Sequence, residues 1–288
     1  MIHTLLVRWP RTEGGLVVAD ERTDGVPAGI DASVAHPARV YDVWLGGKDN
    51  YAADREAAEL AVAANPDILL AVRANRAFLG RAVHHLAADV GIDQFLDIGT
   101  GIPASGNTHE VAQRAVPASR VVYVDNDPVV LAHARALLSS TPEGATGYLD
   151  ADLRDVGTIL EQAAETLDLT RPVALMLVAV LQYIADADDP YGIVTRLLEA
   201  LPSGSHLVIS HPASDIGAEQ VAESMRRYNE RAPQQEQATP RTHADVARFF
   251  DGLEMLEPGV VQLPTWRPGP GVDTDRQLPM WCGVARKP

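Results

Sequence analysis

The stretch "FLDIGTGIPASGN", residues 95–107, decides the fold. It begins with apolar residues of the kind that form a buried strand, meets three glycines, and is followed by a helical pattern. A strand, a glycine-rich turn and a helix in this order are typical of the nucleotide-binding turn of an α/β protein. Such a turn can hold a dinucleotide such as NAD, the phosphate tail of ATP, or S-adenosylmethionine, and each ligand requires different residues around the glycines.

Strand-like and helix-like stretches alternate from residue 94 onward. The expected strands are residues 94–98, 120–125, 145–150, 173–180 and 205–210. The expected helices are residues 107–115, 128–139, 155–166, 190–200 and 215–231. This alternation predicts a doubly wound, Rossmann-like α/β sheet whose strands are mostly parallel.

The last part of the chain breaks the alternation. A short helix, Thr242–Phe250, precedes "LEMLEPGVVQL" and "LPMWCGVAR", which we expect to form two closing strands joined by a long loop rich in proline and glycine. Class I methyltransferases close their sheet with a hairpin that contains an antiparallel strand, whereas ordinary dehydrogenase domains do not. The tail therefore favours a class I methyltransferase sheet.

The residues before the sheet divide into two parts. Residues 1–30 have weak periodicity, and we expect them to form a loose, disordered arm. Residues 31–91 are expected to form a helical cover. It comprises an irregular aromatic stretch at 35–51, a helix at 51–64 capped by Asp49 or Asn50, and a helix from Pro66 to Ala88 closed by Gly91. Residues 92–288 form the core, and we expect 31–288 to be one compact domain.

The residues around the glycines distinguish among the three ligands. No Gly-Lys-Ser/Thr follows them, which argues against the phosphate-binding loop of ATP enzymes. The third glycine of the dinucleotide fingerprint is displaced to Gly106, and Asp97 lies two residues before Gly99. A carboxylate there would repel the pyrophosphate of NAD but attract the sulfonium and ammonium groups of S-adenosylmethionine. The turn therefore favours S-adenosylmethionine as the cofactor.

Further cofactor contacts are expected at the ends of the next strands. Asp125 ends the second strand, where an acid accepts hydrogen bonds from ribose hydroxyls, although NAD offers the same ribose. Asp152 and Leu153 follow the third strand and can take the adenine amino group and ring face. Both acids have an ordinary alternative role. Asp125 could cap a helix, and Asp152 could be a solvated loop acid. The residues predicted to bind the cofactor are Asp97, Gly99, Thr100, Gly101, Asn107, Asp125, Asn126, Asp152, Leu153 and Ala179.

Several stretches together carry a family resemblance. They are "ARVYDVWLGGKDNYAADRE", "VRANRAFLGRAV", "QFLDIGTGIPASGNTHEVAQ", "RVVYVDNDPVVLAHARALL", "RFFDGLEMLEPGVV" and "WRP". From about residue 30 to the C-terminus the sequence closely resembles the bacterial S-adenosyl methyltransferase family, long catalogued as a domain of unknown function. The resemblance implies the class I methyltransferase fold and S-adenosylmethionine as cofactor. It implies little about the methyl acceptor.

The segment from Tyr41 to Arg55 is expected to form a lid over the cofactor. It joins the flexible pair Gly46-Gly47 to aromatic and hydrogen-bonding groups, as a closing element needs. Asn75 interrupts an apolar helical stripe, so it either docks this lid or makes an ordinary helix–helix hydrogen bond. The residues predicted to form the lid or bind the acceptor are Tyr41, Asn50, Arg55, Asn75, Gln182 and Tyr183.

The catalytic residue is not identified by the sequence. Methyl transfer is a displacement on an already activated sulfonium, so alignment matters more than a special catalytic group. The candidates are Tyr183, His211 and Tyr41, of which His211 ends the fifth strand at the sheet edge where ligands bind. No Asn/Asp-Pro-Pro-Tyr/Phe motif follows the fourth strand, which argues against an amino methyltransferase of the DNA-adenine type.

Composition narrows the classes of partner. The chain has 24 basic and 39 acidic residues and a net charge of −15, which disfavours nucleic acid and anionic membranes as main partners. Its one cysteine, Cys282, is expected in the core, and the histidines show no ligand spacing, so we expect no disulfide and no metal. A reducing cytoplasm fits this composition. The longest apolar run, Val173–Leu181, is too short to cross a bilayer.

The leading hypothesis is an S-adenosylmethionine-dependent methyltransferase that acts on a small molecule. One alternative is an NAD-dependent oxidoreductase, against which Asp97 and the closing hairpin argue. The other is a non-catalytic module that binds S-adenosylmethionine. The sequence makes no prediction of the oligomeric state.

Overall fold

The structure, a computed structural model, describes residues 30–288 except residue 138 and the side chains of residues 135–137. The arm expected at residues 1–30 lies outside this range except for its last residue. Asp31–Pro288 form one compact unit.

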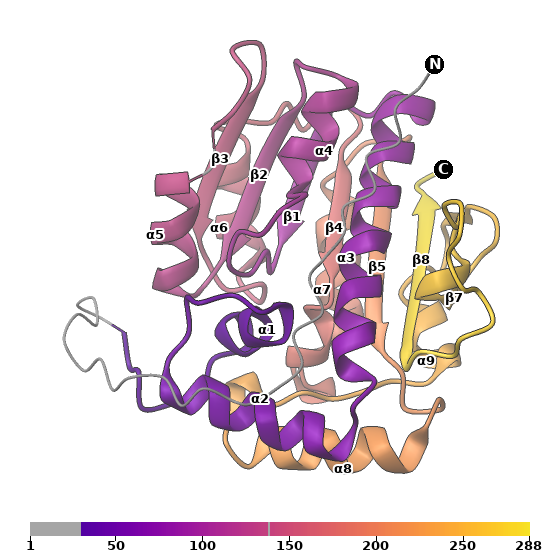
Figure 1. Ribbon diagram of the computed structural model, residues 1–288. Coiled ribbons are helices and arrows are strands. Elements are labelled where there is room, and N and C mark those ends of the chain that lie inside the picture. The colour runs from indigo at the N-terminus through magenta and orange to yellow at the C-terminus, as the bar shows by residue number, and fades with distance from the viewer. Residues whose placement is uncertain (1–29, 138) are drawn as a thin grey trace, which may run out of the picture. The chain divides into compact units, whose positions relative to one another are not determined.

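A single sheet of eight strands forms the centre of this unit (Figure 1). Five parallel strands lie close to their expected positions: β1 (Gln94–Ile98), β2 (Arg120–Asp125), β3 (Ala145–Asp150), β4 (Ala174–Val178) and β5 (His206–Pro212). Their order is β3-β2-β1-β4-β5, so the chain changes direction across the sheet beside β1. Such a switch opens a crevice at the carboxyl ends of the two central strands, where doubly wound sheets bind their ligands.

The closing strands are confirmed with one correction. β8 (Met280–Arg286) runs antiparallel beside β5 and carries the buried Cys282, as expected. The stretch "LEMLEPGVVQL" is not one strand. It forms two short strands, β6 (Glu254–Met255) and β7 (Val261–Gln262), which both pair with β8. Pro258 lies between them and has no N–H to donate to a ladder, which explains the interruption.

Helices cover both faces of the sheet (Figure 1). α3 (Ile68–His84) and α4 (Thr108–Ala115) pack on one face, against side chains such as Phe95 and Met176. α6 (Val156–Ala163), α7 (Pro190–Glu199) and α9 (His243–Arg248) pack on the other, against side chains such as Leu96 and Leu175. Successive strand residues face opposite layers, so both faces of the central strands must be apolar.

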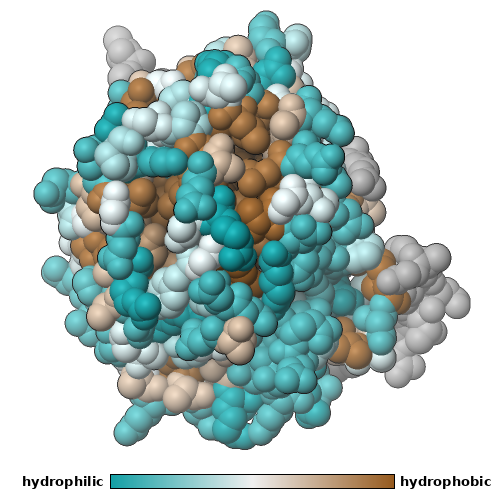
Figure 2. Space-filling view, turned by 180° about the vertical axis from the view of Figure 1, so that it is seen from behind, coloured by the Kyte–Doolittle hydropathy of each residue, from teal (hydrophilic) through white to brown (hydrophobic). Residues whose placement is uncertain are grey.

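Two features complete these layers. α5 (Pro128–Leu137) lies beside β3, and α3 continues into a π-helical turn, His85–Val90, which ends at Gly91 as expected. Seen from behind, the surface over the α6 and α7 layer is mostly hydrophilic, with apolar residues showing between the polar ones (Figure 2). Among the described helices, none is long and apolar enough to cross a membrane.

Three helices cross the carboxyl ends of the parallel strands (Figure 1). They are α1 (Pro37–Leu45), α2 (Ala52–Ala64) and α8 (Ala218–Asn229). These helices share a small apolar core that includes Val40, Ala58 and Tyr228. The helical cover expected at residues 31–91 is therefore present, but α3 belongs to the sheet layers and α8 joins the cover from a distant part of the sequence.

α1 corrects the expectation of an irregular stretch at residues 35–51. Pro37 occupies the first helical position, His36 caps the helix, and Gly46 ends it with φ +81°. Proline at the first position and glycine just past the end are the usual helix limits. The next helix is capped by neither Asp49 nor Asn50. Its N-cap is Tyr51, whose N–H donates to Asp54 Oδ2 at 2.8 Å.

Candidate functional site

A cavity of about 990 Å³, counted to its open mouth, lies at the carboxyl ends of β1, β2 and β4. We call it the first cavity. Several parts of the chain line it: the glycine turn after β1, the strand ends and the turn after β4, the first turn of α1, one face of α3, and residues 235–236 that follow α8. The acids expected at three strand ends, Asp97, Asp125 and Asp152, all line this one cavity.

The glycine turn forms the floor of the first cavity. Gly99 and Gly101 have φ of +72° and +65°, a conformation that side chains disfavour. A Cβ atom at Gly99 would come within 2.2 Å of Val180 Cγ2, whereas a Cβ atom at Gly101 would point into open space. The turn therefore packs tightly against the loop after β4 on one side and leaves room on the other.

Asp97 carries a carboxylate into this low-dielectric site. Its side chain is 5% exposed, and Oδ2 accepts a hydrogen bond from Thr108 Oγ1 at 2.6 Å. Burial raises the pKa of Asp97 to about 6, against the opposing effects of Thr108 and of the Arg76 charge. At neutral pH the carboxylate is ionised, and a cation placed beside it would offset the free-energy cost of burying its charge.

Asp125 fixes the glycine turn from the next strand. Oδ2 accepts from the Gly101 N–H at 2.9 Å, and Oδ1 accepts from the Asp127 N–H at 3.0 Å. Burial raises the pKa of Asp125 above its ordinary value in spite of these hydrogen bonds. Each carboxylate oxygen has a further lone pair, so Asp125 can still accept hydrogen bonds from a ligand.

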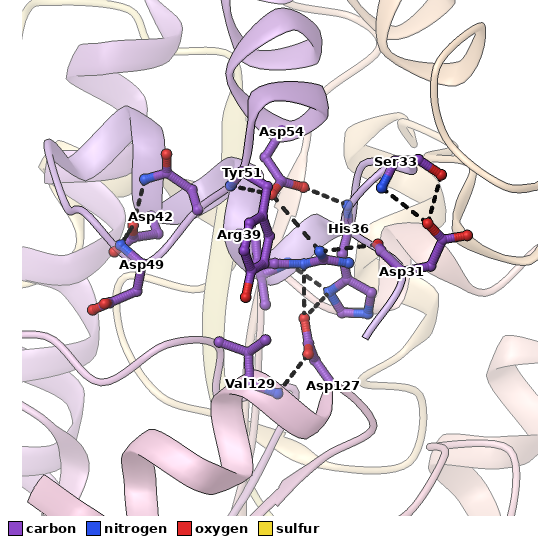
Figure 3. A network of polar contacts seen from close by, with 12 residues as sticks. Asp31, Ser33, His36, Arg39, Asp42, Asp49, Tyr51, Asp54, Asp127 and Val129 are labelled. Atoms are coloured by element: carbon purple, nitrogen blue, oxygen red, sulfur yellow. Dashed lines mark hydrogen bonds and ion pairs between the residues drawn. The ribbon is translucent and has the colours of Figure 1, made fainter. Parts of the chain in front are cut away.

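A polar network anchors the first turn of α1 above the end of β2 (Figure 3). His36 Nδ1 lies 2.9 Å from Asp127 Oδ2, and Arg39 Nε lies 3.2 Å from the same oxygen. The fully buried Asp54 accepts from the backbone N–H groups of His36 and Tyr51. Burial alone would lower the pKa of His36, but the Asp127 hydrogen bond and the nearby acids outweigh burial and raise it.

Arg154 closes the opposite end of the first cavity. Its Nη1 bonds both oxygens of Asp152 at 3.1 Å, and its Nε bonds Asp188 at 3.0 Å. Its Nη2 donates to the carbonyl oxygen of Tyr183 at 3.0 Å. The arginine therefore ties the loop after β3, which carries Asp152 and Leu153, to the turn that follows β4.

A second cavity of about 680 Å³ adjoins the first. It lies between α1, α2, α8 and the turn after β4, and Tyr41, Ala179 and Tyr183 line both cavities. Ala179 has φ +55°, an unusual conformation for a residue with a side chain. The boundary between the two cavities therefore lies just past the end of β4.

Asn75 and Tyr41 lie at this boundary. Asn75 is 2% exposed, and its Nδ2 donates to Tyr41 Oη at 3.0 Å. Its Oδ1 accepts from the Ser210 hydroxyl at 2.6 Å. Asn75 therefore joins α3 to both α1 and β5. It makes the helix–helix hydrogen bond and does not bond the Gly46-Gly47 turn.

Asn50 and Arg55 line neither cavity. Asn50 Nδ2 donates to Asp42 Oδ2 at 2.8 Å, and Arg55 Nη1 donates to Asn50 Oδ1 at 3.1 Å. A Cβ atom at Gly47 would overlap the Asp42 carboxylate. These contacts hold the turn between α1 and α2, whereas the part of the expected lid that faces the cavities is α1.

His211 corrects the expectation of a residue that faces the ligand edge. It is fully buried and lines neither cavity. Nε2 accepts from Arg241 Nη1 at 2.9 Å, and Nδ1 donates to the Pro212 carbonyl oxygen at 2.9 Å. Burial lowers the pKa of His211 to about 3. Because both ring nitrogens are engaged, His211 has no free lone pair with which to act as a base.

Asn107 lines a small separate hollow on the other side of the glycine turn. The remaining residues predicted to bind the cofactor line the first cavity, and Gln182 and Tyr183 line the second. The sequence analysis missed His36, Arg76, Arg154 and Glu236, which also line the first cavity. Arg76 lies beside Asn75 in the sequence, which is a usable signal. Glu236 comes from a distant loop and has no local signal.

Comparisons with known proteins confirm the family resemblance. A family model described as S-adenosyl methyltransferase matches residues 23–288. The structure of a DUF574 family protein from Streptomyces avermitilis is 48% identical, with a TM-score of 0.86 over 90% of this chain and 99% of that one. A proposed methyltransferase from Thermobifida fusca is 40% identical, with a TM-score of 0.82 over 91% and 98% of the two chains. No curated protein matches the chain. The chain therefore belongs to the S-adenosyl methyltransferase family, and its cofactor is S-adenosylmethionine.

Proposed function

We propose that the first cavity holds S-adenosylmethionine and that the second cavity receives a small-molecule acceptor. The observation that carries the proposal is that the two cavities adjoin, with Tyr41, Ala179 and Tyr183 lining both. The first cavity places acids at successive strand ends, and the second is lined mainly by apolar side chains. Methyl transfer needs two ligands that meet at one boundary and are shielded from water.

The residues of the first cavity fit the cofactor. Asp97 supplies the negative charge that an ammonium and a sulfonium attract, and Asp125 can accept hydrogen bonds from ribose hydroxyls. Gly101 leaves open space that any side chain would fill. Asp152 and Leu153 lie in the loop after β3 and line the first cavity, which supports a contact with the adenine ring. The same acids would face the pyrophosphate of NAD, which argues against that dinucleotide.

S-adenosylmethionine, when bound, supplies an electrophilic methyl carbon on a sulfonium. The chain contributes position and shielding. Tyr41 is held by the hydrogen bond from Asn75 and by its own donation to the Val72 carbonyl oxygen at 3.3 Å. The strained backbone at Ala179 is typical of a segment whose conformation serves a site. α1 and α8 both contribute residues to the lining of the second cavity.

Isothermal titration calorimetry tests the proposal. We expect S-adenosylmethionine and its demethylated product, S-adenosylhomocysteine, to bind the purified protein, and NAD not to bind. Asp97→Asn and Asp125→Ala should each weaken binding, whereas Glu254→Gln, on the far strand β6, should not. Unchanged affinity in both site variants would place the cofactor elsewhere. We also propose a cytoplasmic location, which the single buried cysteine supports.

A further inference from the structure

We infer that the second cavity binds a neutral, ring-bearing amine that donates an N–H hydrogen bond to Gln182 Oε1. The inference rests on the proposed function, because it names the class of acceptor that this methyltransferase takes. Three independent features of the lining carry it: its charge, its one unpartnered polar atom, and its aromatic walls.

The lining of the second cavity carries no charge. Among the described residues that form it, none is Lys, Arg, His, Asp or Glu. A charged ligand would leave water for a site with no counter-charge, at a cost of several kcal/mol. The first cavity, in contrast, contains Asp97, Asp125 and Arg154. The uncharged lining therefore selects a neutral molecule.

Gln182, which lines the second cavity, carries a hydrogen-bond acceptor that has no partner among the described residues. The residue is 5% exposed, and its Nε2 donates to the Ala179 carbonyl oxygen at 2.8 Å. A carbonyl only accepts, so this bond fixes which end of the amide is the nitrogen. The other end, Oε1, is buried and has no partner among the described residues. A buried hydrogen-bond acceptor without a donor costs free energy. A ligand N–H in this cavity would supply the missing hydrogen bond.

Several other polar groups of the lining already have partners within the protein. Trp44 Nε1 donates to the Ala58 carbonyl at 3.2 Å, and Ser224 Oγ donates to the Ala61 carbonyl at 3.1 Å. The Tyr41 hydroxyl bonds Asn75 and Val72. Among the buried side-chain polar atoms of the described lining residues, only Gln182 Oε1 has no partner, so a ligand that donates one hydrogen bond matches it.

Four aromatic rings line the second cavity: Tyr41, Trp44, Tyr183 and Tyr228. Val72, Met225 and Met280 add aliphatic and thioether surface. Aromatic and methionine side chains pack well against flat rings. The apolar area buried in this way, rather than polar contacts, would supply most of the affinity. The walls therefore favour a ring system over a flexible polar molecule.

The lining also points to nitrogen as the methylated atom. A hydroxyl acceptor needs a base to remove its proton, and the titratable groups among the described residues of this lining are all tyrosines. Burial raises the pKa of Tyr183 to about 12, so its hydroxyl stays protonated. A neutral amine needs no base. Its lone pair forms the new N–C bond, the electrons of the breaking C–S bond remain on sulfur, and the positive charge passes to nitrogen. One N–H proton then leaves to water.

A matched set of naphthalene probes tests the inference on the full-length protein saturated with S-adenosylhomocysteine. Binding is followed at pH 8 by the quenching of Trp44 fluorescence, with Trp44→Phe as the signal control, and by calorimetry. We expect 2-naphthylamine to bind most tightly, and the 2-naphthoate anion and the 2-naphthyltrimethylammonium cation to bind at least tenfold more weakly. With S-adenosylmethionine instead, we expect N-methyl-2-naphthylamine as product and no methyl ether from 2-naphthol.

Three variants test whether these residues form the binding site. Gln182→Leu should weaken 2-naphthylamine by about 3- to 10-fold and leave naphthalene, which has no donor, unchanged. Val221→Phe on α8 should fill the second cavity and abolish the binding of both 2-naphthylamine and naphthalene. Met225→Phe provides a second variant that fills this cavity. Retained S-adenosylhomocysteine binding shows that each variant is folded.

The outcomes separate this inference from the proposed function. Tightest binding of either charged probe, equal loss of naphthylamine and naphthalene in Gln182→Leu, or undiminished binding in folded filling variants would overturn the inference. Methylation of 2-naphthol in place of the amine would do the same. Failure of the wild-type protein to bind S-adenosylhomocysteine would instead contradict the proposed function itself.

Discussion

At Asp97, the negative charge that we expect to bind the cofactor also lowers the stability of the cofactor-free protein. The pKa of Asp97 is raised from 3.8 to about 6, so the native state holds this proton more tightly than the unfolded chain does. The free energy of unfolding therefore falls as pH rises between these two values, and above about pH 6 the full cost of the buried charge is present. That cost is on the order of 3 kcal/mol for a shift of this size. A cationic ligand would offset it.

We therefore predict that Asp97→Asn stabilises the cofactor-free protein while it weakens cofactor binding. An asparagine oxygen can still accept from Thr108, but it carries no charge. The melting temperature of the variant should exceed that of the wild type at pH 8, and the difference should shrink toward pH 4. Differential scanning calorimetry at the two pH values measures this. A variant less stable than the wild type at pH 8 would show that the charge is compensated within the protein.

The same carboxylate predicts a pH dependence of binding in the wild type. Protonation of Asp97 below about pH 6 removes the attraction for an ammonium group. The affinity for S-adenosylhomocysteine should therefore fall as pH drops through 6, and Asp97→Asn should lose this dependence. Calorimetric titrations between pH 5 and 8 measure it. A profile shared by both proteins would assign the dependence to another group.

Asp125 differs from Asp97 because its carboxylate oxygens already accept hydrogen bonds from the backbone N–H groups of Gly101 and Asp127. We predict that Asp125→Ala weakens S-adenosylhomocysteine binding by about 1–3 kcal/mol, through the loss of charge-assisted hydrogen bonds to the ribose. Asp125→Asn keeps one acceptor oxygen and should lose less. Calorimetry of both variants measures the difference. Equal affinity of Asp125→Ala and the wild type would remove this residue from the site.

At the scale of elements, α1 is the helix that we expect to respond to the cofactor. Its first turn lines the first cavity, and the His36–Asp127 pair ties it to the end of β2. The turn after α1 is held separately by Asp42, which accepts from the Asp49 N–H and from Asn50. We therefore expect a ligand in the first cavity to affect the two segments differently.

Hydrogen exchange with mass spectrometry measures this difference. On binding S-adenosylhomocysteine, residues 38–42 should gain protection together with the glycine turn, and residues 46–50 should change little. Protection that appears at residues 46–55 but not at 38–42 would favour a lid built from the turn. Protection confined to the strand ends would make α1 a rigid scaffold.

For the whole molecule, the sequence predicts the sheet far better than the cover. β1 and β2 match their expected residues because both are buried, mainly apolar runs bounded by glycine or aspartate. β3 is only partly buried, and its bounds also match. α1 was missed because its nine residues mix charged, aromatic and apolar side chains without a clear period. The packing of α8 on α2, and the arrival of Glu236 at the first cavity, join residues far apart in the sequence and leave no local pattern.

The candidate site, like the fold, could be predicted only in part from the sequence. Strand ends predict which residues reach the ligand edge, and Asp97, Asp125 and Asp152 do line the first cavity. The face to which a strand residue points is set by packing. Ser210 bonds Asn75 on one face of β5, so the next residue, His211, faces the opposite layer, where it meets Arg241. Local sequence could not distinguish these two neighbours.

A crystal structure of the protein with bound S-adenosylhomocysteine tests the central claim most directly. We predict the ribose hydroxyls on the Asp125 carboxylate, the amino group on the side of Asp97, and the sulfur at the boundary formed by Tyr41, Ala179 and Tyr183, facing the second cavity. A ligand whose sulfur points to solvent or is separated from the second cavity by closed protein, with no path for an acceptor, would contradict the account.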